Sequence, residues 1–177
     1  MKKFALVLGI CLMVFACTKE EFQQVSPSKY LKIDLTNGSA LKVMPPDSIE
    51  YQQLNIDLLQ VRAKLDSAGW QDLPTNQGIY DLVQLLDTDT MISNTVMLAD
   101  TLKEIRLVLG DNNSIMVDSV LHDLDIPSGQ ASGLKFKFQP PVYLSGMDSL
   151  MINFDGDASV HQTGNGSYKL QPVIHVE

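Results

Sequence analysis

Aspartates separated by one residue are the closest approach to a metal-binding pattern in this sequence. They occur in three places: Asp87 and Asp89, Asp123 and Asp125, and Asp155 and Asp157. Calcium takes about six to eight oxygen ligands from flexible loops, so alternate aspartates around a glycine can supply two or three of them. Asp155 and Asp157 flank Gly156 and are therefore the candidate calcium ligands. The same tripeptide is also typical of an ordinary turn after a strand.

The histidines do not form a recognisable catalytic or zinc-binding motif. His122, His161 and His175 lie in three separate segments, without the spacing of a zinc site. The sequence also lacks a nucleophile elbow, a phosphate-binding loop and a metalloprotease motif. We therefore expect no catalytic residues and no enzymatic activity, with a carboxylate-pair glycosidase as the remaining enzyme alternative.

Three aromatic residues near predicted turns are candidates for glycan binding. Trp70 is the single tryptophan and follows a turn, and Tyr80 and Tyr143 lie in or near other loops. Exposed aromatic rings can stack against the apolar faces of sugars, because they combine a large apolar surface with a polar edge. The alternative is that Trp70 belongs to the hydrophobic core, as a tryptophan does in many β-sandwiches.

Composition and charge limit the class of partner. The chain has 177 residues, of which 45% are hydrophobic, so it can bury a sizeable core. Its formal net charge is -8, which argues against nucleic acid as a partner because a phosphate backbone would be repelled. The one long apolar run, from Phe4 to Ala16, is shorter than the roughly 20 residues of a membrane-spanning helix.

The N-terminus has the pattern of a secretory signal. Lys2 and Lys3 precede the apolar run from Phe4 to Phe15, and Ala16 stands directly before Cys17. The residues Val14-Phe15-Ala16-Cys17 resemble a bacterial lipobox, in which the cysteine becomes diacylated and begins the mature protein. The resemblance implies a signal peptide over residues 1–16, a lipidated Cys17 and a tether over residues 17–28. Two acyl chains anchor a protein stably in a membrane.

The residues after Cys17 suggest where the anchored protein resides. Lys19, Glu20 and Glu21 resemble the export signal that directs Bacteroidota lipoproteins to the outer face of the outer membrane. The sequence therefore predicts an outer-membrane lipid anchor facing the cell exterior, with a periplasm-facing anchor as the alternative. Cys11 leaves with the signal peptide, so the mature chain has no cysteine for a disulfide.

Several segments alternate apolar and polar residues with the period of a strand. The clearest cover residues 30–36, 134–138 and 150–154. In residues 54–65 the alternation changes phase near Leu58 and Leu59, which predicts a β-bulge, although a helix over 48–64 is an alternative. These short strands and the turns between them predict one all-β domain over residues 29–177, an antiparallel sandwich.

Other segments give less definite predictions. Residues 102–109 and 114–118 read as a hairpin joined by Gly110-Asp111-Asn112-Asn113, because asparagine and aspartate tolerate left-handed turn geometry. Residues 79–86 are ambiguous between a helix and a strand. Tyr168, Leu170, Ile174 and Val176 alternate as one final strand.

The order of motifs resembles the domain-of-unknown-function 4382 family of bacterial lipoproteins. The resemblance rests on Ile33-Asp34-Leu35-Thr36, on Tyr51 through Val61, on Pro127-Ser128-Gly129-Gln130 and above all on Thr163 through Ile174. It implies an immunoglobulin-like or transthyretin-like sandwich on a membrane anchor. It implies no activity, because the family has no established biochemical role.

Together these observations favour a non-enzymatic lipoprotein whose β-sandwich binds a partner. An extracellular glycan or protein is the expected ligand, and calcium at Asp155 and Asp157 is the one cofactor considered. The alternative is a structural or adhesion element that assembles with protein partners through its sheet edges.

Overall fold

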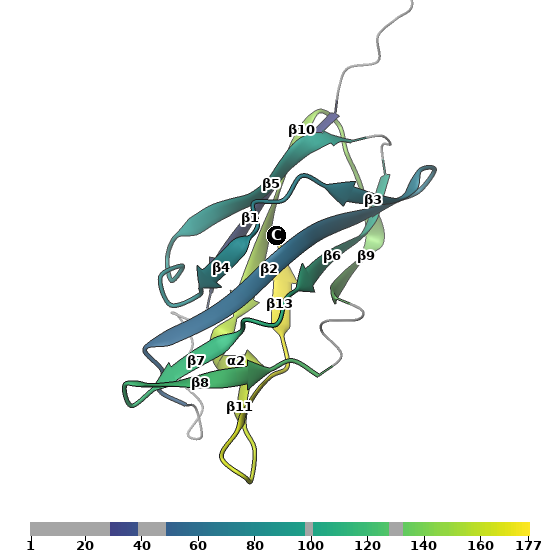
Figure 1. Cartoon of the computed structure of the whole chain (residues 1–177). Coiled ribbons are helices and arrows are strands. Elements are labelled where there is room, and N and C mark those ends of the chain that lie inside the picture. Colours follow the sequence, from purple (N-terminus) through teal and green to yellow (C-terminus); the bar gives the residue numbers. More distant parts are fainter. Residues whose placement is uncertain (1–28, 39–48, 98–100, 128–132) are drawn as a thin grey trace, which may run out of the picture.

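The protein is an all-β sandwich of two packed sheets, seen in a computed structural model (Figure 1). The structure describes residues 29–38, 49–97, 101–127 and 133–177. The four-stranded sheet has the order β13 (Val173–Val176), β10 (Met147–Asp155), β1 (Lys29–Asn37) and β5 (Asp89–Met97).

The second sheet has nine strands and is built around the long strand β2 (Gln53–Leu65). Its main path is β11 (Val160–Gln162), β12 (Tyr168–Leu170), β8 (Val120–Asp125), β7 (Ser114–Val117), β2, β6 (Thr101–Leu109) and β9 (Leu134–Tyr143). β3 (Gly69–Leu73) and β4 (Gly78–Asp81) also pair with β2. A short helical turn, α2 (Gly156–Ser159), links β10 to β11. The prediction of an all-β sandwich is therefore confirmed.

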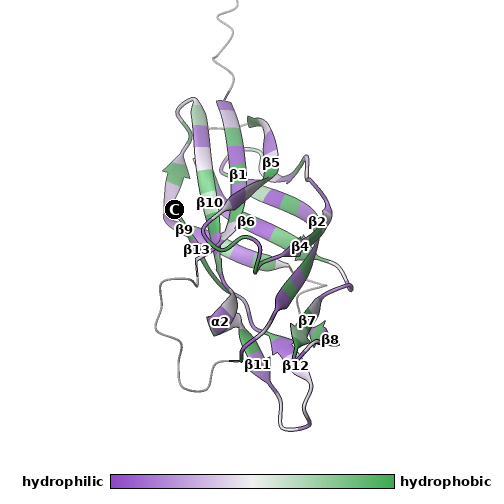
Figure 2. Ribbon diagram, turned by 90° about the vertical axis from the view of Figure 1, so that its left-hand side faces the viewer, coloured by the Kyte–Doolittle hydropathy of each residue, from purple (hydrophilic) through white to green (hydrophobic). Residues whose placement is uncertain are grey.

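The core lies between the sheets and follows from the alternation in the strands. Leu31, Ile33 and Leu35 of β1 are fully buried and meet inward-facing residues of the other sheet. Figure 2 shows the resulting bands of apolar and polar residues along β1, β2 and β6. Each buried aliphatic side chain contributes roughly 1.5–3 kcal/mol relative to an exposed one, so the strand period largely sets which face packs inward.

The phase change predicted in β2 is confirmed as a bulge. The pairing of β2 with β6 shifts between Leu58 and Gln60, which leaves Leu59 as the additional residue. Leu58 and Val61 are both fully buried, while Leu59 is 42% exposed. The bulge thus keeps apolar side chains inward on both sides of the shift, and the strand, not the alternative helix, is the observed structure.

Both sheets are mixed, whereas the sequence predicted antiparallel pairing. β1 pairs in parallel with β10, and β12 pairs in parallel with β8. Parallel neighbours need a long connection, and here the chain between β1 and β10 forms most of the second sheet. Strand direction depends on this long-range connection and not on local alternation.

Two local predictions were wrong in their pairing. The expected hairpin is absent, because β6 and β7 do not pair with each other: both pair with β2, at different parts of its length. The expected final strand is divided between β12 in the larger sheet and β13 in the smaller one. Pro172 lies at this division, where it has no backbone N–H to continue a ladder.

The segment with ambiguous periodicity is a strand followed by turns. β4 ends at Asp81, and its pairing with β2 runs from Gly78 opposite Leu58 to Asp81 opposite Asn55. The carboxylate of Asp81 then accepts hydrogen bonds from the backbone N–H groups of Leu54 and Val83, at 3.1 Å each. This side chain ends β4 and holds the following turn against β2.

The start of β1 and the short hairpins lie at opposite ends of the sandwich. β1 begins at one end, where the N–H of Tyr30 donates to the carbonyl of Gly146 at 2.7 Å. The β7–β8 and β11–β12 hairpins lie at the opposite end, at the bottom of Figure 1. Any segment that precedes Lys29 is therefore attached at the end away from these hairpins. Among the described residues, no helix is long and apolar enough to cross a membrane.

Candidate functional site

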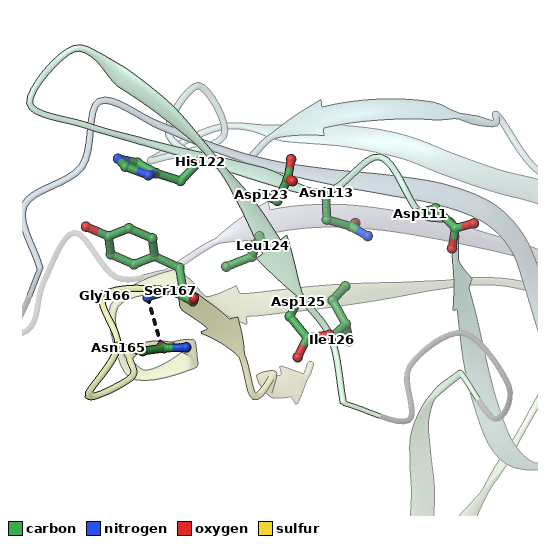
Figure 3. Close-up of a pocket in the computed structure, with 11 residues that line it drawn as sticks. Asp111, Asn113, His122, Asp123, Leu124, Asp125, Ile126, Asn165, Gly166 and Ser167 are labelled. Carbon is green, nitrogen blue, oxygen red and sulfur yellow. Dashed lines mark hydrogen bonds between the residues drawn. The ribbon is translucent and has the colours of Figure 1, made fainter.

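A polar groove lies at the hairpin end of the molecule, between β8 and the loop that joins β11 to β12 (Figure 3). Its volume is about 590 Å³. The lining residues are mostly polar: Asp111, Asn113, His122, Asp123, Leu124, Asp125, Ile126, Asn165, Gly166, Ser167 and Tyr168.

The side chain of Asn113 fixes one wall of the groove. It is buried, accepts a hydrogen bond from the N–H of Asp57 at 2.9 Å, and donates to the carbonyl of Gly110 at 2.7 Å. The backbone carbonyl of Asn113 accepts from the N–H of Leu124 at 3.0 Å. Asn113 thus joins β2, the turn before β7 and the strand β8, so the groove rests on a rigid part of the sheet.

The opposite wall is a tight loop between β11 and β12. The N–H of Thr163 donates to the carbonyl of Ser167 at 2.8 Å, and the N–H of Gly166 donates to Thr163 at 2.9 Å. Gly166 has a φ of 84°, which a glycine adopts without the steric cost of a Cβ. The Asn165 carboxamide oxygen accepts from the N–H of Ser167 at 3.3 Å. The loop is therefore held by its own hydrogen bonds.

An aromatic pair closes one end of the groove. The rings of His122 and Tyr168 have centroids 5.0 Å apart and are tilted by 55°. Tyr168 is buried, and its hydroxyl accepts from the Gln162 carboxamide at 3.3 Å. In the described parts of the chain, His122 is bonded to no carboxylate or serine. The imidazole packs against a ring, which is not the arrangement of a catalytic relay.

The groove carries an excess of negative charge. Asp111, Asp123 and Asp125 line it with exposed side chains, and Lys169 lies at the rim, 3.8 Å from Asp125. Such a surface accepts hydrogen bonds and attracts cationic groups, so it suits a ligand rich in hydroxyl or ammonium donors. Asp123 and Asp125 were visible in the sequence as an acidic pair, but Asn113, Asn165 and Tyr168 carried no signal that set them apart.

The residues predicted to bind calcium surround the helical turn α2. Asp155 is buried and its carboxylate accepts from the N–H of Ala158 at 3.0 Å, as an N-cap does. Asp157 accepts from the phenol of Tyr51 at 2.8 Å. Within the described residues, no group of three or more His, Cys, Asp and Glu side chains is arranged to hold a metal ion. Calcium binding by Asp155 and Asp157 stays a prediction.

Tyr51 is the most strongly perturbed titratable group near α2. Burial raises the pKa of its phenol well above the ordinary value, and the hydrogen bond to Asp157 raises it further. The negative charges of Asp157, Asp155 and Asp81 act in the same direction, because they disfavour a second anion. Tyr51 is thus a proton donor in a structural contact.

The three aromatic candidates for glycan binding lie in three different surroundings. Trp70 is on the outward face of β3, where the Arg106 guanidinium is 4.3 Å from its ring, so the interpretation as a core tryptophan is wrong. Tyr80 packs against the core, and its hydroxyl donates to the carbonyl of Asn76 at 2.5 Å. Tyr143 is 65% exposed, and Lys29 lies 5.1 Å from its ring. The three do not form one aromatic platform.

The remaining sequence predictions fall on surface strands or outside the described residues. His161 and His175 are exposed on β11 and β13 respectively, in different sheets. Cys17, Lys19, Glu20 and Glu21 lie outside the residues that the structure describes.

A two-sheet sandwich with a polar groove at one end is the class of protein that these observations define. The chain matches the family described as "Domain of unknown function (DUF4382)" over residues 24–172. It belongs to that family. No curated protein and no solved structure matches the chain.

Proposed function

We propose that this protein is a lipoprotein held in the outer membrane by a diacylglyceryl group on Cys17, with its sandwich facing the cell exterior. The β-sandwich serves as a non-enzymatic binding module. The observation that carries the proposal is the position of the polar groove, at the end of the sandwich away from the start of β1 (Figures 1 and 3). An N-terminal tether would then hold the opposite end near the membrane.

The chemistry of the groove favours a hydroxyl-rich ligand such as a glycan. The exposed carboxylates of Asp123 and Asp125 can each accept hydrogen bonds from neighbouring sugar hydroxyls. The ring pair of His122 and Tyr168 adds an apolar wall at one end. A few polar groups fixed beside an apolar surface are the usual composition of a small-molecule site.

The edge strands of the two sheets favour a binding module, because they are poorly suited to pairing with the edge strands of another protein. The edge strand β9 carries Lys135, Lys137 and the pair Pro140-Pro141, which discourage pairing with another strand. The edge strands β11 and β13 have three and four residues. The edge strand β5 has nine residues, and part of its open side is covered: the N–H of Asn76 donates to the carbonyl of Ile92 at 2.9 Å, and the Asn76 carboxamide donates to the carbonyl of Met91 at 2.8 Å. Assembly through long open strands therefore has little support in the described residues.

Metabolic labelling with a radioactive fatty acid, followed by protease treatment of intact cells, tests the anchor and its direction. We expect label on the wild-type protein and none on Cys17→Ala, and loss of the protein when intact cells are treated. Equal labelling of both proteins would overturn the lipid anchor. Protection in intact cells, with digestion only after lysis, would overturn the exterior location in favour of a periplasm-facing anchor.

A glycan array probed with the purified full chain in detergent tests the groove. We expect binding that Asp123→Asn and Asp125→Asn each weaken by roughly tenfold, since a lost charged hydrogen bond costs about 1.5–3 kcal/mol. Asp87→Asn is the matched control, because Asp87 is exposed and lies outside the groove. No binding to any glycan, or the same loss in the control, would overturn the assignment.

A further inference from the structure

The outward face of the larger sheet carries a concentration of positive charge around Trp70. Two neighbouring cross-strand rows run over β3, β2, β6 and β9. One row is Trp70, Lys64, Glu104 and Lys137, and the next is Asp72, Arg62, Arg106 and Lys135. We call Arg62, Lys64, Arg106, Lys135, Lys137 and Trp70 the cationic face.

The second row sets three like charges directly opposite one another. Arg62 of β2 faces Arg106 of β6, and Arg106 faces Lys135 of β9. Like charges in directly opposed positions destabilise a sheet, and neighbouring strands are only about 4.8 Å apart. A ligand with negative charge would be attracted to this row of cations.

The local carboxylates do not neutralise the cationic face. Asp72 is paired with Arg62, and Glu104 lies 3.4 Å from Arg106. Five cations against these two carboxylates leave a net charge of +3 across the two rows. Lys64, Lys135 and Lys137 are exposed and have no carboxylate partner among the described residues. The chain as a whole has a net charge of -8, so the face is opposite in sign to the rest of the protein.

Three of the cations lie close to the ring of Trp70. Its ring lies 4.3 Å from the Arg106 guanidinium, 5.4 Å from that of Arg62 and 5.8 Å from the Lys64 ammonium. Stacking uses the flat face of a guanidinium and leaves its in-plane N–H groups directed outward. The Nε of Arg106 is buried without a hydrogen-bond partner in the described structure. The ring and Glu104 therefore hold this guanidinium in place on the face.

We propose that the cationic face binds an anionic polysaccharide, a chain that carries carboxylate or sulfate groups. The cations follow one another across three adjacent strands, so successive negative groups of a linear polymer can each meet one. Guanidinium groups recognise carboxylate and sulfate oxygens through paired N–H donors, and the indole adds an apolar surface for a sugar ring. The site is separate from the groove of Figure 3 and does not depend on lipidation.

A lipid surface fits this face less well than a polysaccharide does. Three of the large exposed apolar residues, Tyr30, Val96 and Met147, lie side by side across β5, β1 and β10 on the other sheet. A protein that rests on a bilayer inserts apolar side chains as well as presenting positive charge. The cationic face combines its charge with a single half-buried tryptophan.

Binding of the purified full chain in detergent to immobilised polygalacturonate, with neutral dextran as control, tests the proposal. We expect binding to polygalacturonate alone, weakening steeply as salt screens the charges. Arg106→Gln and Lys135→Glu should each weaken it at least tenfold, and Trp70→Phe should weaken it less. Circular dichroism establishes that each variant is folded.

Lys169→Glu is the matched control, since it makes the same change of charge at the hairpin end of the molecule. It should leave polygalacturonate binding unchanged, as should the groove variant Asp123→Asn. Equal losses in these controls, or no binding by the wild type, would overturn the proposal. Tighter binding to phosphatidylglycerol vesicles or to single-stranded DNA than to polygalacturonate would also overturn it. If the protein binds no glycan on the array but still binds polygalacturonate, the proposed function of the groove is rejected and the proposal for the cationic face is retained.

Discussion

The phenol of Tyr51 donates a hydrogen bond of 2.8 Å to the carboxylate of Asp157, a residue 106 positions further along the chain. Tyr51 stands just before β2, and Asp157 lies in α2, so this contact ties the long strand of one sheet to the end of β10 in the other. A Cβ at Gly156 would lie 2.6 Å from the Tyr51 hydroxyl. The glycine between the two aspartates therefore makes room for the contact.

Tyr51→Phe should lower the free energy of unfolding by about 1–2 kcal/mol, because it removes a partly buried hydrogen bond to a charged group. Urea denaturation measures the change. Tyr30→Phe is the control, since Tyr30 is 42% exposed. Equal midpoints for Tyr51→Phe and the wild type would show that the bond contributes nothing to stability.

The raised pKa of Tyr51 should make the fold sensitive to alkali. In the folded state the phenol stays protonated, whereas in the unfolded chain it ionises near pH 10. Its contribution to stability is therefore fully present below about pH 10 and is lost as the pH rises above that value. A near-ultraviolet titration should show one tyrosine that ionises only when the protein unfolds. Tyr51→Phe should abolish that late component, and its persistence in the variant would assign it to another tyrosine.

Asn37→Ala should destabilise the fold by about 2 kcal/mol. The buried Asn37 carboxamide donates to the carbonyl of Leu82 at 2.9 Å and accepts from the N–H of Gly156 at 3.3 Å. The substitution removes both of these hydrogen bonds from a buried position between the turn after β4 and α2. Thermal unfolding of Asn37→Ala beside the exposed control Asn94→Ala tests this, and similar melting temperatures for the two variants would contradict it.

Gly110→Ala should also destabilise the protein, by about 1–3 kcal/mol, because of overpacking. The added Cβ would lie 2.3 Å from an Asp57 carboxylate oxygen. That carboxylate accepts from the Asn112 carboxamide at 3.0 Å, so it cannot move aside without losing a hydrogen bond. Gly146→Ala is the control, since no atom lies within 4 Å of its Cβ position. Chemical denaturation should separate the two variants, and equal effects would refute the steric explanation.

Lys135→Glu should stabilise the folded protein while it weakens polygalacturonate binding. It places a carboxylate opposite Arg106, where an opposite-charge pair is worth about 0.2–1 kcal/mol. Calorimetry at low salt should show a higher melting temperature for the variant, and the difference should shrink as salt is added. A lower melting temperature would mean that Lys135 is not repelled by its neighbours.

Local patterns predicted the strands but not their partners. In β1 and β9 the alternation alone identified the buried face, because side chains of a strand point to opposite sides in turn. The bulge at Leu58–Gln60 was visible for the same reason. The hairpin after Leu109 was wrong because β6 and β7 both run antiparallel to β2, one after the other along its length, so the chain does not reverse direction between them. This arrangement is not encoded next to the turn.

The candidate sites were harder to predict from the sequence. Trp70 is separated from Arg106 by 36 positions in the sequence, and only the register of β3, β2 and β6 brings them together. The groove likewise joins β8 to a loop that follows β11. The sequence favoured Asp155 and Asp157 because their spacing resembled a ligand loop, yet Asp155 accepts a hydrogen bond within its own turn and Asp157 accepts one from the distant Tyr51. Local spacing contains no information about such contacts.

The parallel pairing of β1 with β10 has a consequence for how the chain is made. Of the described strands β1 is synthesised first, and its partner β10 follows only after eight others. Until Asp155 has been added, one edge of β1 lacks the neighbour that covers it, and Leu31, Ile33 and Leu35 cannot be fully buried. Nascent chains that stop before Met147 should therefore be open to proteolysis and to pairing with one another. The smaller sheet becomes complete only when β13, the last of the described strands, has also been made.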